Sequence, residues 1–254
     1  MTPTASIPLA MPSPVFDLAL ARRLADASRR AYLPTATKAA GSLSSVLLCD
    51  GRVLMEDIGD AILIAVQGTK NMRGWLTDLD VTKKEIAKGV EVHAGFLGES
   101  GSMLPVITER LNGNCKPLLI GGHSKGGGDG TYLGFALQQS GFPVRAIYTF
   151  ASPRVGNAGF RDAYNELCGA KTFRVICAGD VVPLIPGVLD GYRHVGQEVL
   201  LNGGKALVNP SHYTELLLDS WRTARALERQ DWEFILKYHG IDTDYIPALN
   251  RVSP

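Results

Sequence analysis

The sequence predicts an α/β fold: a mostly parallel sheet covered by helices on both faces. Short, continuously apolar runs such as residues 61–66 and 145–150 are typical of strands buried on both faces. Stretches with helical periodicity lie between these runs, and alternation of strands with helices indicates parallel βαβ units. With 254 residues, of which 45% are hydrophobic and 20% charged, the chain can bury a core without a metal or disulfide.

The N-terminal elements are predicted from periodicity and turn signals. Residues 15–32 read as an amphipathic helix with arginines on its polar side, ended by Pro34. Residues 45–49 and 53–55 flank Asp50-Gly51, a strong hairpin signal.

The remaining elements follow the same alternation. Further strands are predicted at 61–66, 117–121, 145–150 and 171–177, and further helices at 95–111, 126–139, 157–168, 212–229 and 231–239. In such sheets ligands bind at the carboxyl ends of the strands, so the residues that follow each strand are the first functional candidates.

Composition excludes several classes of function. Lys plus Arg number 26 against 25 for Asp plus Glu, which leaves no basic excess for nucleic acid. No apolar run approaches the roughly 18–20 residues of a membrane span, so no stable membrane insertion is expected. Residues 1–14 read as a flexible segment without a signal-peptide pattern, which favours a cytoplasmic or already processed chain with one domain over 15–254.

Ser124 lies in a G-x-S-x-G pattern between a predicted strand and a predicted helix. This is the nucleophile elbow, in which a sharp turn raises the serine hydroxyl above the sheet. Gly122 and Gly126 would let the neighbouring backbones pass closely. The alternative is a glycine-rich turn with an idle serine.

Six segments in order carry a family resemblance: 66–79, 92–96, 122–127, 148–157, 180–186 and 192–199. They resemble the class 3 lipases, the family of the fungal triacylglycerol lipases within the α/β-hydrolases. The resemblance covers about residues 60 to 215. It implies a Ser-Asp-His esterase with an amphipathic lid. The implied substrates are small-molecule or lipid esters, with a lipid–water interface as a candidate partner. It implies no cofactor and no metal.

One position departs from the family pattern. The elbow usually reads G-H-S-L-G-G-A, and here Lys125 replaces the leucine. Lys125 and Asp129 at i, i+4 on a helix can pair. Alternatively, Lys125 faces the acyl pocket and disfavours long chains.

Asp180 is the expected catalytic acid. It follows the strand 171–177 through Ala178-Gly179, which places it at the same sheet edge as Ser124. The chain order Ser, then Asp, then His is that of this fold. The alternatives are a turn or capping aspartate at this position, and Asp190 as the acid.

The catalytic base is sought among the histidines after Asp180. His212 follows Asn209-Pro210-Ser211 and precedes a predicted terminal helix, where the family places its base, so His212 is preferred. His239 before Gly240 is the alternative base, although at a predicted helix end its imidazole could also serve only to complete the helix C-terminus. His194 is interpreted as structural.

The oxyanion hole needs preorganised donors. One is expected from the backbone N–H of Lys125, the residue after the nucleophile. The resemblance supplies the other at Thr69, directly after the strand 61–66, with Gly68 free to turn. An ordinary strand exit is the alternative reading.

A short amphipathic helix is expected just after Thr69. Its apolar side chains are Met72, Trp75, Leu76 and Leu79. Core packing would explain the spacing as well, but the position beside the oxyanion residue favours a lid and substrate-binding element. Asp78 and His93 match family positions interpreted as structural.

The predicted function is therefore a carboxylic ester hydrolase, lipase or esterase, that works through an acyl-enzyme. The alternatives are a short-chain or aromatic-ester esterase, an acyltransferase or peptidase with the same triad, and a catalytically silent binding module.

Overall fold

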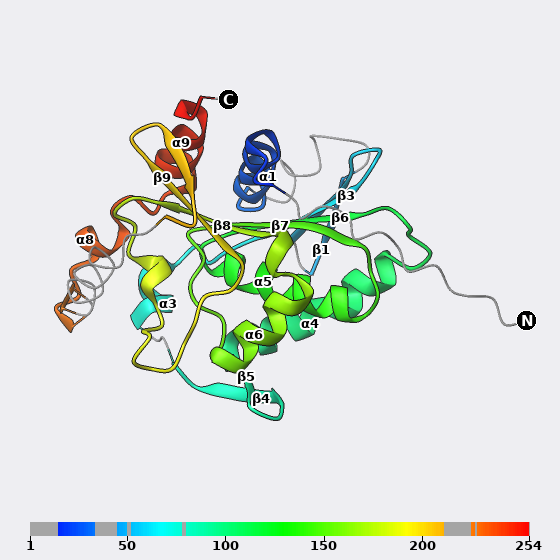
Figure 1. The fold of residues 1–254 in the computed structure, drawn as a ribbon, viewed down its shortest axis with the longest axis horizontal. Helices are drawn as coiled ribbons and strands as arrows, with labels where there is room; N and C mark the ends of the chain where they lie inside the picture. Colours follow the sequence, from blue (N-terminus) through cyan, green and yellow to red (C-terminus); the bar gives the residue numbers. More distant parts are fainter. Residues whose placement is uncertain are drawn as a thin grey trace, which may run out of the picture.

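The computed structural model describes residues 15–33, 45–49, 52–77, 80–210, 225–226 and 228–253. An eight-stranded sheet with the order β1-β2-β3-β6-β7-β8-β9-β10 runs through its centre (Figure 1). Its strands are β1 Ser45–Leu48, β2 Val53–Asp57, β3 Ile62–Val66, β6 Leu118–His123, β7 Val144–Phe150, β8 Thr172–Cys177, β9 Gln197–Asn202 and β10 Lys205–Val208. Strands β3, β6, β7, β8 and β9 pair in parallel, and β1, β2 and β10 join antiparallel at the two edges.

Helices cover both faces of this sheet. Those of the described residues are α1 Leu18–Arg30, α3 Met72–Thr77, α4 Ala94–Arg110, α5 Lys125–Gln139, α6 Ala158–Leu167, α8 Trp232–Leu236 and α9 Ile246–Arg251, with short turns η1 Gly169–Lys171, η2 Val182–Leu184 and η3 Ile241–Tyr245. Figure 1 shows α1 and α9 on one face and α4, α5 and α6 on the other. The predicted α/β fold, with a mostly parallel sheet and helices on both faces, is confirmed.

The helix α1 shows how the sequence produces these layers. The side chain of Asp17 caps it by accepting a hydrogen bond from the Leu20 N–H at 3.0 Å. Arg29 and Arg30 in the last turn complement the helix dipole. Leu24 is fully buried and packs over Gly121 of β6, where a Cβ would lie 3.2 Å from its methyl group.

Two hairpins are found that the sequence prediction missed. β4 (Lys83–Ala87) pairs with β5 (Val90–His93), and β9 pairs with β10. The turn Gly203-Gly204 has positive φ at both residues, the requirement of a tight hairpin, so Asn-Gly-Gly was an available signal.

The C-terminal region differs from the prediction. Most of the predicted helix 212–229 lies outside the described residues, and so does the predicted flexible segment 1–14. The single domain over 15–254 stays a prediction. The helix predicted at 231–239 ends at Leu236, and Tyr238 takes a φ of +63° that no helix continues. A further helix, α9, then packs against α1.

Candidate active site

Ser124 lies on a sharp turn between β6 and α5, as the elbow pattern predicted. Its φ of +60° and ψ of −131° are strained for a residue with a side chain, at a cost of about 1–3 kcal/mol. The Ser124 N–H donates to the Phe150 carbonyl at 2.8 Å, which ties the turn to β7. A Cβ on Gly122 would lie 2.1 Å from the Gly126 carbonyl oxygen, so this turn admits no larger residue there.

Ser124, His239 and Asp180 form a continuous hydrogen-bonded chain. His239 Nε2 lies 2.9 Å from Ser124 Oγ, and His239 Nδ1 lies 3.1 Å from Asp180 Oδ2 and 3.2 Å from Oδ1. All three residues are buried. Because Nδ1 faces a carboxylate, it carries the proton and leaves Nε2 to accept from the serine hydroxyl.

The histidine that is hydrogen-bonded to Ser124 is not the one that the sequence analysis preferred. His212, expected as the base, lies outside the described residues, and the imidazole that meets Ser124 belongs to His239. Because the backbone bends at Tyr238, His239 follows a loop rather than completing a helix. Both histidines follow Asp180 in the sequence, so chain order alone does not distinguish them.

Two further donors hold the Asp180 carboxylate. The Val182 N–H donates to Oδ1 at 3.0 Å, and the Tyr245 hydroxyl donates to Oδ2 at 2.6 Å. Burial, followed by the charge of Asp180, raises the pKa of Tyr245 well above 10, so this hydroxyl keeps its proton. Sequence reasoning did not identify Tyr245, since a tyrosine 65 residues beyond Asp180 carries no local signal.

A neutral histidine supports the backbone of His239. His123 Nε2 lies 2.8 Å from the His239 carbonyl oxygen, and Nδ1 lies 3.1 Å from the Tyr32 hydroxyl. Burial, reinforced by the neighbouring His239, lowers the pKa of His123 to about 3. The neutral ring therefore donates from Nε2 to the carbonyl and accepts at Nδ1 from Tyr32.

The two expected oxyanion residues follow adjacent parallel strands. Val66 of β3 pairs with Gly122 of β6, and Thr69 and Lys125 each come three residues later. A Cβ on Gly126 would lie 2.4 Å from the Val66 carbonyl oxygen, so the two strand exits are in close backbone contact. The Thr69 hydroxyl oxygen accepts from the Asn71 N–H at 3.1 Å, and its O–H remains a candidate donor beside the backbone N–H of Thr69.

The expected lid residues lie in α3 beside the serine. The Met72 sulfur is 3.9 Å from Ser124 Oγ, and Leu76 is buried. Figure 1 shows α3 at the same side of the molecule as α8. Leu79 lies outside the described residues. An apolar cluster joins α3 to the loop after Asp180 and to α8; it contains Met72, Trp75, Leu76, Val181, Leu184, Ile185, Ala226, Trp232, Phe234, Ile235 and Leu236.

Lys125 pairs with acidic neighbours. Its Nζ lies 3.0 Å from Asp129 Oδ2 and contacts the Glu99 carboxylate of α4. The i, i+4 pairing is confirmed, and the ammonium is engaged with α4. Burial raises the pKa of Asp129 to about 6, against the opposing effect of Lys125.

Other candidates have structural contacts. His93 accepts the Gly95 N–H at 3.0 Å and caps α4, and His194 Nε2 donates to the Pro183 carbonyl at 2.7 Å. The Asp190 carboxylate accepts the Gly187 N–H at 3.1 Å within its own loop. Within the described part of the chain, no group of three or more His, Cys, Asp or Glu could hold a metal ion.

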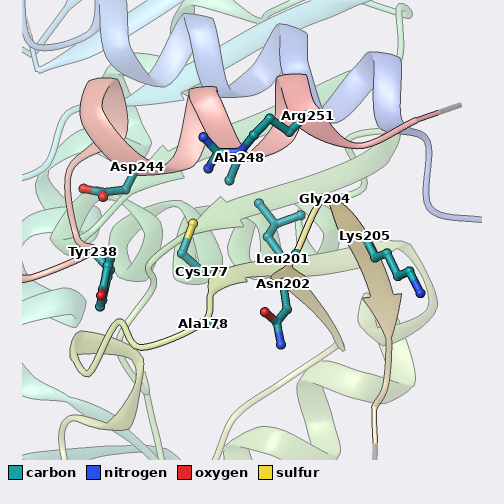
Figure 2. A pocket seen from close by; sticks show the side chains of 11 residues that line it. Cys177, Ala178, Leu201, Asn202, Gly204, Lys205, Tyr238, Asp244, Ala248 and Arg251 are labelled. Carbon is teal, nitrogen blue, oxygen red and sulfur yellow. The ribbon is translucent and has the colours of Figure 1, made fainter.

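A cavity of about 580 Å³ lies between β8, the β9–β10 hairpin and α9 (Figure 2). Two of its lining residues, Ala178 and Tyr238, are close in sequence to Asp180 and His239. None of Ser124, Asp180 and His239 lines the cavity. Its lining residues are Cys177, Ala178, Leu201, Asn202, Gly203, Gly204, Lys205, Tyr238, Asp244, Ala248 and Arg251.

A serine on a strand–turn–helix elbow at the carboxyl edge of a parallel sheet, within reach of a histidine and an aspartate, defines an α/β-hydrolase. Within this class the sequence profile described as Lipase (class 3) matches residues 63–189. That match covers half of the chain, and the chain belongs to the class 3 lipase family.

Known proteins resemble the chain in sequence and in fold. Secreted mono- and diacylglycerol lipase 1 of Fusarium solani is 34% identical over 150 residues, which cover 56% of this chain and 44% of that protein. A lipase of Rhizopus niveus is 31% identical, over 63% of this chain and 43% of that protein. The chain spans about half the length of the curated relatives it matches. The solved lipase of Rhizopus microsporus var. chinensis has the same fold, with a TM-score of 0.62, 24% identity, and coverage of 82% of this chain and 87% of that one.

The expectation of a cytoplasmic chain is contradicted by these relatives, because the Fusarium solani protein is named as secreted. The composition of residues 1–14 is thus a misleading guide to location. Among the described helices, none combines the length and apolar character that a bilayer crossing requires.

The His123 ring should stay neutral in the folded protein throughout the range from pH 5 to 8. We expect its Cε1 proton resonance to show no titration there. In the unfolded chain the imidazole takes up a proton near pH 6.5, so this group lowers the free energy of unfolding by about 2 kcal/mol as the pH falls from 7.5 to 5.

Chemical denaturation at both pH values checks the size of this effect. Between pH 7.5 and pH 5, the free energy of unfolding of His123→Asn should fall by about 2 kcal/mol less than that of the wild type. A resonance that titrates with a midpoint above pH 5 would show that the ring becomes charged in the folded state.

Proposed function

We propose that this protein is a carboxylic ester hydrolase that acts on acylglycerols or other lipid esters through Ser124, His239 and Asp180. The observation that carries the proposal is the hydrogen-bonded chain from Ser124 Oγ through both ring nitrogens of His239 to Asp180. Family membership supports the reaction class, and the relatives named as lipases support the substrate class.

The geometry suits nucleophilic acyl transfer. His239 Nε2 removes the Ser124 proton as the oxygen attacks the ester carbonyl. The imidazolium that forms is stabilised by Asp180, whose carboxylate is already oriented by Val182 N–H and the Tyr245 hydroxyl. Nε2–H then protonates the leaving alcohol, and water, activated by the same nitrogen, hydrolyses the acyl-enzyme.

The tetrahedral oxygen would be held by the backbone N–H groups of Lys125 and Thr69. The strand pairing Val66–Gly122 supports this assignment, because it brings the exits of β3 and β6 together. Removal of one such donor typically costs roughly 3–4 kcal/mol of transition-state stabilisation. The positive end of α5 adds a favourable field at the same position.

The helix α3 is proposed as a lid, with α8 as its packing partner. The Met72 side chain contacts the nucleophile itself, so we expect α3 to move when an acyl chain approaches Ser124. The apolar side chains that α3 shares with α8 and the loop after Asp180 would then become exposed. Such a surface suits a lipid–water interface.

Ser124→Ala should lower ester hydrolysis by about 10⁴-fold or more, because no other group replaces the nucleophile. Hydrolysis of p-nitrophenyl butyrate measures the loss, and circular dichroism checks that the fold is retained. Ser102→Ala, at an exposed serine of α4, is the matched control and should retain full activity. Comparable activity in the Ser124 variant would exclude this nucleophile.

The choice of base is tested by covalent labelling. A fluorescent organophosphonate should label Ser124 in the wild type and in His212→Ala, and at least about 100-fold more slowly in His239→Ala. The reason is that, among the residues the structure describes, the imidazole that meets Ser124 Oγ is that of His239, at 2.9 Å. Loss of labelling in His212→Ala with retention in His239→Ala would reverse the assignment.

Acyl chain length is tested with p-nitrophenyl esters from acetate to palmitate. Because the Lys125 ammonium is engaged by Glu99 and Asp129, it does not place a charge in the acyl site, and we expect hydrolysis to extend to long chains. Activity confined to acetate and butyrate would instead indicate a short-chain esterase. Product analysis with added alcohol separates hydrolysis from acyl transfer.

A further inference from the structure

The first turns of α5 carry almost no side chains. Residues 125–130 read Lys-Gly-Gly-Gly-Asp-Gly, so Lys125 and Asp129 are the two residues with more than a hydrogen atom as side chain. Glycine is a poor helix former because it loses the most backbone freedom on folding. The segment that must hold the strained Ser124 turn is therefore intrinsically weak as a helix.

Both side chains are engaged with α4. Lys125 Nζ contacts the Glu99 carboxylate and lies 3.0 Å from Asp129 Oδ2, and Ser100 Oγ lies 3.2 Å from Asp129 Oδ1. Arg52 approaches Glu99 at 3.7 Å from the outside. The Asp129 side chain is fully buried, and the Lys125 side chain is 11% exposed. We call Lys125, Asp129, Glu99 and Ser100 the α4–α5 polar cluster.

This cluster is unfavourable for stability on general grounds. A positive charge at a helix N-terminus opposes the helix dipole. Buried ion pairs lose hydration that their attraction often fails to recover, and apolar replacements are frequently as stable. A polar cluster at this site therefore needs a reason other than folding stability.

We propose that Lys125 is a positioning residue whose side chain, anchored by Glu99 and Asp129, sets the direction of its own backbone N–H in the oxyanion hole. The inference rests on the proposed ester hydrolase function. Because Lys125 and Asp129 are one turn apart on one face of α5, their joint attachment to α4 fixes the rotation of the first turn. Gly128 packs on the Phe96 ring of α4, where a Cβ would lie 2.6 Å from the ring, so α4 is the reference surface for this turn.

The test uses Lys125→Met, which keeps an unbranched side chain one atom shorter and the backbone N–H but removes the charge. We expect kcat for p-nitrophenyl butyrate to fall about 10- to 100-fold with KM changed less than about twofold, because the donor acts in the transition state. Amide hydrogen exchange of residues 124–130 should accelerate at least about 10-fold. Glu99→Gln, at a half-exposed partner, should change both quantities in the same direction.

Lys116→Met is the matched control. It removes an ion pair of similar geometry, Lys116 Nζ to Asp57 Oδ2 at 2.6 Å, outside the site. It should leave kcat and the exchange of residues 124–130 unchanged. Lys125→Arg, which retains a cation for Glu99 and Asp129, should recover kcat to within about threefold of the wild type.

The two readouts separate the possible failures. If the wild type hydrolyses the ester, and Lys125→Met and Glu99→Gln leave kcat and hydrogen exchange unchanged, the positioning role is overturned. If the wild type hydrolyses no ester but exchange still accelerates in Lys125→Met, the proposed function fails and the anchoring of the first turn stands. A lower melting temperature with wild-type kcat at 25 °C would show a structural role only and would also overturn the inference.

Discussion

The close contact between two backbones at the elbow is the constraint on which the site depends. The Gly126 Cα lies against the carbonyl oxygen of Val66, and Gly122 lies against the carbonyl of Gly126. A side chain at Gly126 would push α5 away from the exit of β3, and one at Gly122 would push α5 away from β6. Because the strands are parallel, Thr69 and Lys125 each follow the carboxyl end of one of two adjacent strands.

A chain of buried polar groups extends from this elbow to the acid. Tyr32 contacts His123, His123 donates to the His239 backbone, and His239 bridges Ser124 and Asp180. The His123 ring lies 5.0 Å from the His239 ring, so a charge on both would be strongly repulsive. The low pKa of His123 therefore keeps its ring neutral beside His239.

The helix α3, whose Met72 contacts Ser124, packs with the segment that leads to His239. The helix α8 ends at Leu236, three residues before His239, and its apolar residues pack in the same cluster as α3. Movement of α3 would therefore remove packing from a segment that leads directly into the triad. The His239 residue is held separately, by its contacts with His123 and Asp180.

Local patterns determined much of this protein. Continuous apolar runs predicted the inner strands. The glycine spacing around Ser124 and the strand before Asp180 placed both residues at one edge of the sheet. These features are predictable because short-range sterics and strand direction depend on residues adjacent in sequence. Which histidine contacts Ser124 was decided by the tertiary structure. His212 and His239 both follow Asp180, and only the packing of α9 and η3 against α1 and the sheet brings His239 to the serine. Tyr245 and the Glu99 partner of Lys125 are likewise contacts between segments distant in sequence, and no periodicity encodes such contacts.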